Sequence, residues 1–141
     1  MDEPTKRYLA EIGRRGGTRS RRQLSPDDAR RMVQKREARR AVDAFATSRL
    51  ATAVPQLPGV EFVRDGITDL AADRETESAL LVSIAAPRLR LLGVRLATTI
   101  PDAELRLQQR LLAAHGDAAH ARYNALRRRI VSFQRAAACV N

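Results

Sequence analysis

The stretch "YNALRRRIVSFQRAA", residues 123–137, carries the clearest periodic pattern in the 141-residue chain. Its apolar side chains recur at alternating intervals of three and four positions, at Tyr123, Leu126, Ile130, Phe133 and Ala137. Because an α-helix turns by about 100° per residue, these positions form one stripe along one side of a helix. The spacing predicts a final helix from Asp117 to about Ala138 that packs this stripe on a bundle and exposes its arginines.

A second stretch, "ESALLVSIAA" at residues 77–86, is apolar nearly all round and predicts the buried helix of that bundle. Capping and breaking residues delimit the other expected helices, over 5–12, 26–53, about 63–71, 87–92 and 101–115. Residues 94–101, "VRLATTIP", are expected to form a loop, because no other segment offers a partner strand. The chain therefore predicts an all-α fold.

The charge is unevenly distributed along the chain. The net charge is +10, and 24 of the 26 basic residues are arginines. Residues 1–40 carry 13 basic and 6 acidic side chains, a net of +7, whereas residues 41–141 carry 13 and 10, a net of +3. The segment "PQLPG", residues 55–59, stops any helix at about the place where this balance changes. We expect a basic N-terminal helical arm over 1–54 and a compact bundle of about four helices over 60–141.

The arm contains the main candidate binding site. The stretch "GRRGGTRSRRQLSPDDARR", residues 13–31, places seven arginines among three glycines and ends in a helix start, where Ser25 can cap and Asp28 completes a capping box. Guanidinium groups and backbone amides can converge there on phosphates. The candidate nucleic-acid-binding residues are Arg14, Arg15, Arg19, Arg21, Arg22, Arg30 and Arg31. An acidic protein surface and a solvated linker without a ligand are the alternatives.

The same expected helix continues with Lys35, Arg36, Arg39 and Arg40 against a single Glu37. This half of the helix suits water or an anionic partner, and the apolar half after Ala41 suits packing. No aromatic residue is interleaved with the arginines of residues 13–31, so the pattern predicts phosphate contacts and does not predict base stacking.

No pattern of catalytic or metal-binding residues is present. Asp65, Asp69 and Asp73 follow helical spacing, but no His or Asn joins them, so we expect a solvated acidic face without a metal. His115 and His120 are not at metal spacing, and Cys139 lies about five helical turns beyond His120. Phosphate-binding loops and nucleophile elbows are missing from the sequence. We expect neither an enzyme nor a cofactor.

The single cysteine allows no disulfide within the chain, which suits a reducing cytoplasm. The start of the sequence does not resemble a signal peptide, and the longest apolar run is far shorter than the ~20 residues of a membrane span. We expect a cytoplasmic protein without a membrane partner.

Residues 8–41, "YLAEIGRRGGTRSRRQLSPDDARRMVQKREARRA", resemble the opening of small uncharacterised proteins of GC-rich bacteria. The stretches "LVSIAAPRLRLLGV" (81–94) and "HARYNALRRRIVSFQRA" (120–136) resemble a second small helical family. The resemblance implies an antitoxin-like or accessory role beside a nucleotidyltransferase-like protein. It supplies no catalytic residue.

Two functional hypotheses follow from the sequence. The first is a non-enzymatic binding module that contacts a protein partner through the stripe on Tyr123, Leu126, Ile130 and Phe133, while the arm attracts phosphates. The second is a nucleic-acid-binding regulator that uses the arginine-rich arm and the helix that starts at Ser25.

Overall fold

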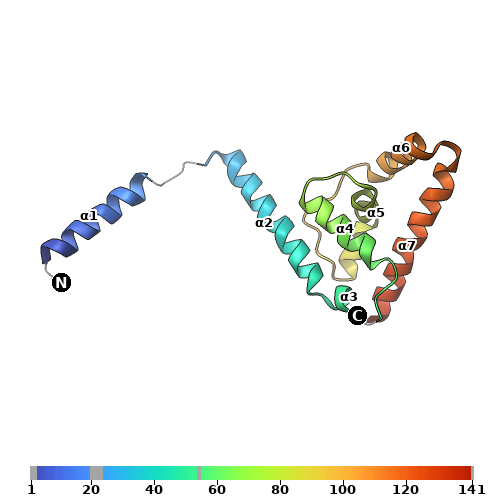
Figure 1. Ribbon diagram of the computed structural model, residues 1–141, viewed down its shortest axis with the longest axis horizontal. Helices are drawn as coiled ribbons and strands as arrows, with labels where there is room; N and C mark the ends of the chain where they lie inside the picture. Colours follow the sequence, from blue (N-terminus) through green and yellow to red (C-terminus); the bar gives the residue numbers. More distant parts are fainter. Residues whose placement is uncertain (1–2, 20–23, 54, 141) are drawn as a thin grey trace. The chain divides into compact units, whose positions relative to one another are not determined.

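The computed structural model describes residues 3–19, 24–53 and 55–140, with side chains from 4–12 in the first of these ranges. Within the described residues the chain is all-α, as predicted (Figure 1). The helices are α1 (Glu3–Arg19), α2 (Pro26–Ala46), α3 (Arg49–Thr52), α4 (Val60–Ala71), α5 (Glu77–Leu91), α6 (Ala103–His115), the 3-10 turn η1 (Gly116–Ala118) and α7 (Ala119–Val140).

Contacts between residues divide the chain into two units, Met1–Met32 and Val33–Asn141. The sequence placed the end of the arm at residue 54, whereas the contacts place the division about twenty residues earlier. The reason is that the second half of α2 carries Ala38, Ala41 and Phe45, which are all buried. The sequence predicted that this apolar half of the helix would pack against other residues. Its buried side chains belong to the core of the second unit.

The first unit contains α1 and the first turns of α2. The expected end of the first helix at Gly13 was wrong, because α1 continues through all three glycines to Arg19. Glycine costs a helix about 1 kcal/mol per residue relative to alanine, which lowers stability without forbidding the helix. The predicted N-cap of α2 is present, since Ser25 Oγ accepts the N–H of Asp28 (3.1 Å), but the Asp28 carboxylate accepts the hydroxyl of Ser25 (2.7 Å) and not its backbone N–H as in a full capping box.

In the second unit, α5 contacts α4, α6 and α7. Its side chains are buried on nearly every side, as expected for the stretch 77–86. The expected restart at Pro87 was wrong, since Pro87 lies inside one continuous helix. A proline in a helix interior costs about 3 kcal/mol. Burial of Ala85, Ala86 and Leu89 around it is the packing that offsets this cost.

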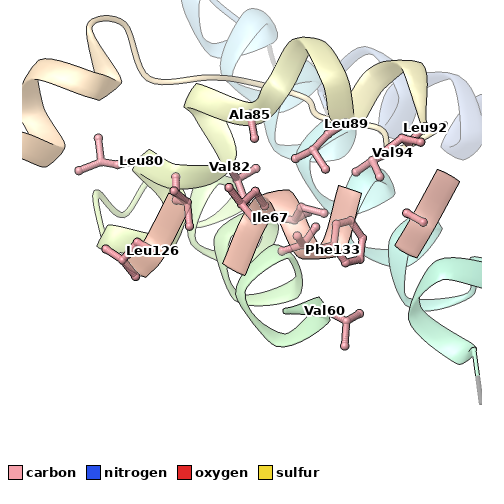
Figure 2. Packing of buried hydrophobic residues seen from close by; sticks show 14 of the residues in the cluster. Val60, Ile67, Leu80, Val82, Ala85, Leu89, Leu92, Val94, Leu126 and Phe133 are labelled. Carbon is pink, nitrogen blue, oxygen red and sulfur yellow. The ribbon is translucent and has the colours of Figure 1, made fainter. Parts of the chain in front are cut away.

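The predicted stripe of α7 forms one wall of the core. All five of its side chains are buried, and Phe133 is fully enclosed. Figure 2 shows Phe133 near Ile67 of α4, and it shows Leu126 and Leu80 in the same apolar cluster. The core is mostly aliphatic.

Helices α4 and α5 pack closely together at Gly66. A methyl group built on Gly66 would lie 2.5 Å from the carbonyl oxygen of Ser78 and 2.5 Å from Cγ2 of Val82. Glycine in a helix interior costs up to about 1 kcal/mol relative to alanine. In the folded unit its missing side chain is what lets the two helices meet.

The segment 94–101, expected as a loop, contains no helix or strand and lies beside Ala38 and Ala41 of α2. Ser83 Oγ of α5 accepts the N–H of Ile100 (3.1 Å) and donates to the carbonyl of Ala79 (2.8 Å). Leu92 and Val94 are buried in the core. On α2, the ring centroid of Phe45 lies 6.5 Å from that of Phe133. The helix therefore has one face fixed by packing and one face left to solvent.

That helix ends earlier than the sequence indicated. We expected it to reach about Ala53, but α2 ends at Ala46 and the short α3 follows. Ser48 caps α3, since its Oγ accepts the N–H of Ala51 at 3.3 Å. Serine is among the residues that prefer this cap position, but a helix start at Ser48 was not predicted.

Candidate nucleic-acid interface

The outer face of α2 is strongly basic. Four cations, which we call the α2 basic face, lie on the side opposite the buried side chains: Lys35, Arg36, Arg39 and Arg40. Helical geometry places them within an arc of about 140°, and all four are exposed. Asp43 is the carboxylate on the same side, so this surface carries a net charge of +3.

Most of these cations have no acidic partner. Arg40 pairs with Glu37 (2.8 Å), whereas Lys35, Arg36 and Arg39 form no ion pair with any described residue. Elsewhere in the unit, arginines are neutralised in the pairs Arg74–Asp69, Arg106–Glu75, Arg122–Glu77 and Arg129–Glu61. Elsewhere, at most two arginines without an ion pair fall within any five consecutive described residues, as with Arg88 and Arg90 on α5 or Arg127 and Arg128 on α7, whereas α2 has three such cations in residues 35–39. Unneutralised positive charge is therefore densest on α2.

Two of the seven predicted nucleic-acid-binding residues have described side chains. Arg30 and Arg31 are exposed on α2, and Arg30 Nη1 lies 3.8 Å from Asp27 Oδ1. Arg14, Arg15 and Arg19 belong to the backbone of α1, but their side chains lie outside the described residues. Arg21 and Arg22 lie outside them altogether. Their part in binding stays a prediction.

The predicted partner-binding stripe is core. Tyr123, Leu126, Ile130 and Phe133 are all buried inside the chain's own second unit. Tyr123 Oη donates to Glu104 Oε1. Burial raises the pKa of Tyr123 above its usual value, and Glu104 adds to this rise while Arg127 opposes it. A partner could reach this stripe only if the bundle opened, so the predicted contact has no free surface in this fold.

The predicted acidic face serves to join α4 to α5. Asp69 Oδ2 accepts the hydroxyl of Thr76 (2.6 Å), and Asp69 Oδ1 accepts Nε of Arg74 (3.0 Å). Thr76 Oγ1 in turn caps α5 by accepting the N–H of Ala79 (3.1 Å). Asp73 lies beyond the end of α4 with φ 55°, so the helical spacing of the three aspartates is broken. No cluster in the described part of the chain could hold a metal ion.

These contacts predict a pH-dependent contribution to stability. Burial raises the pKa of Asp69, but the hydrogen bonds from Thr76 and Arg74 and the charge of Arg74 outweigh burial and lower it below its ordinary value. A lowered folded pKa stabilises the fold above the unfolded value of about 4, and this is lost as the pH falls through the folded pKa.

We therefore expect Asp69→Asn to lower the free energy of unfolding by about 1 kcal/mol at neutral pH. The difference from the wild type should shrink below about pH 4 in urea denaturation series. Asp65→Asn, an exposed change on the same helix, should leave the stability unchanged at every pH. A deficit of Asp69→Asn that stays constant down to pH 2 would contradict this role of the charge.

The histidines and the cysteine are not brought together. His120 Nε2 lies 3.0 Å from Asn124 Nδ2 near the start of α7, and Cys139 is exposed near its end.

Within the described residues, every helix is too short or too polar to cross a membrane.

Two further arginines, which the sequence did not predict, lie near α2. Arg90 at the end of α5 and Arg95 in the following segment line a groove beside Arg40. They are about fifty residues from α2 in sequence, and no local pattern joins them to it.

Comparisons of the chain with models of known protein families, with curated proteins and with solved structures find no match.

Proposed function

We propose that this protein is a non-enzymatic nucleic-acid-binding protein that contacts phosphates through the α2 basic face. The observation that carries the proposal is one exposed helix face with four cations, of which Lys35, Arg36 and Arg39 lack an ion pair among the described residues. Arginine forks bind phosphate oxygens in two-point fashion, and unpaired cations release counterions when they neutralise phosphates.

The surroundings of α2 favour phosphate contacts over base stacking. Phe45, the aromatic residue of α2, is buried on the opposite side. The buried face, with Ala38 and Ala41, holds this part of the helix in a defined orientation, so the cations need little ordering on binding. Binding of this kind depends strongly on salt and reads sequence weakly. The arginines of residues 14–31 would add to the same attraction.

This proposal places the nucleic-acid hypothesis ahead of the protein-partner hypothesis. An antitoxin-like or accessory protein that used Leu126 and Phe133 would need those side chains on its surface, and both are buried. A reducing cytoplasm is the compartment we propose, because the one cysteine, Cys139, is a free thiol.

Binding can be measured by fluorescence anisotropy with DNA and RNA duplexes of about 20 base pairs at about 50 mM salt. We expect the triple variant Lys35→Gln/Arg36→Gln/Arg39→Gln to bind about 10–100-fold more weakly than the wild type. The slope of log K against log salt should become shallower by up to about 2.7, because three phosphate contacts are lost.

A matched control removes the same charge elsewhere. The triple variant Arg64→Gln/Arg128→Gln/Arg135→Gln changes three exposed arginines that also form no ion pair among the described residues. We expect it to retain most of the affinity. Equal losses in the two triple variants would show that binding follows net charge and has no site on α2. Absence of wild-type binding at low salt would contradict the proposal altogether.

A further inference from the structure

A groove runs beside the α2 basic face, within the second unit. It lies between α2, the end of α5 and the segment that follows α5, and its volume is about 410 Å³. Three arginines are among the residues that line it, Arg40, Arg90 and Arg95, together with Glu37. The remaining wall is mostly backbone and small side chains from Gly93 to Ala97.

The charge of the groove is unbalanced. Glu37 is occupied by Arg40 at 2.8 Å, and neither Arg90 nor Arg95 forms an ion pair with a described residue. Three cations against one anion leave a net charge of +2 in one concave surface. An anion in the groove could therefore bind Arg90 and Arg95 without first breaking an ion pair.

The backbone of the groove also offers hydrogen-bond donors. The hydrogen bonds of the described residues leave the N–H groups of Arg95, Leu96 and Ala97 without an acceptor. The chain before them is fixed, because the N–H of Val94 donates to the carbonyl of Leu89 (3.0 Å) and the side chain of Val94 is buried. Arginines without an ion pair and amide groups without an acceptor, close together in one segment, are the kinds of donor that bind an anion.

We propose that this groove is a binding site for a phosphate group, held by Arg90 and Arg95 and by the adjacent amides. The inference rests on the proposed function, since the groove adjoins the α2 basic face at Arg40 and would hold one backbone phosphate of a nucleic acid bound there. The volume lies within the range of small-ligand sites, about 300–1,000 Å³, so a phosphate fits with its attached sugar. The same chemistry suits the phosphate of a free nucleotide.

Titration of the 15N-labelled full chain with inorganic phosphate, followed by amide NMR shifts, tests the site. We expect the amide signals of Arg95, Leu96 and Ala97 to shift with saturation, while an equal ionic strength of chloride leaves them in place. The double variant Arg90→Gln/Arg95→Gln should lose this saturable shift and keep the melting temperature of the wild type, because both side chains are exposed. Equal shifts in the wild type and the double variant would overturn the proposal.

Measurements of duplex binding distinguish a nucleic-acid phosphate from a free phosphate in the groove. They also distinguish failure of the groove proposal from failure of the proposed function. We expect the double variant to bind the DNA duplex about 5–10-fold more weakly, with a salt slope shallower by about 0.9, because one phosphate contact is lost. The α2 triple variant should bind the DNA duplex about 10–100-fold more weakly and keep the phosphate shifts. DNA binding without any phosphate effect on these amides would overturn the groove and leave the proposed function standing. Phosphate binding without DNA binding would overturn the proposed function and leave a site for free phosphates.

Discussion

Gly66→Ala is expected to lower the free energy of unfolding by about 2–3 kcal/mol, although alanine is the better helix former. The added methyl group would lie 2.5 Å from Ser78 O and 2.5 Å from Val82 Cγ2. The side chain of Val82 has no free space, because it is fully buried, and Ser78 O belongs to the backbone of α5. The two helices must therefore move apart, which loosens the largest helix–helix contact of the unit.

The helical propensity gained by this change, about 1 kcal/mol, works in the opposite direction. Asp65→Ala is the matched control, because it adds an alanine at the neighbouring exposed position of α4. Urea denaturation should place the control within about 0.5 kcal/mol of the wild type and Gly66→Ala well below it. If Gly66→Ala proved as stable as the wild type, the close approach of α4 and α5 at this residue would be wrong.

The features that the sequence predicted well are those with a local physical signal. The stripe of α7 was visible because residues three and four positions apart share one side of a helix, and all five of its members are buried. The cap at Ser25 was visible because the residue types of a capping box stand at fixed offsets. The prediction of an all-α bundle depended on local patterns of this kind.

The features that the sequence did not predict depend on contacts between distant residues. The division between the units falls at Met32 because Phe45 packs against Phe133. The helix-breaking residues 55–59 lie between these two residues in the sequence, so no local pattern predicted their contact. Pro87 stays inside α5 because its neighbours are buried. Local rules favoured a break at each of these places, and packing in the folded unit outweighed them.

The candidate site divides in the same way. The cations of α2 were visible in the sequence as a basic half-helix, and the structure adds that the opposite face is buried. Arg90 and Arg95 were not predicted, because one lies at the end of another helix and one in a loop, and only the fold brings them beside Arg40. The hydrogen bond between Ser83 and Ile100 fixes the segment that carries one of them.

Leu126→Asp is expected to unfold the second unit. The side chain of Leu126 is 1% exposed, so the change removes a buried aliphatic group and places a carboxylate in the core. Loss of a buried leucine costs about 2–5 kcal/mol, and an unpaired polar group adds several more. The sum approaches the whole stability of a small domain, about 5–15 kcal/mol. Far-UV circular dichroism should show loss of helicity at room temperature.

Arg128→Asp is the control, because it places the same carboxylate two residues away on the exposed side of α7. It should keep the helical signal and shift the melting temperature by a few degrees at most, while Leu126→Ala should lie between the two variants. This series separates a core position from a partner surface. A partner surface would tolerate Leu126→Asp with full helicity and lose only binding, and that result would contradict the packing of α7 on which the orientation of α2 depends.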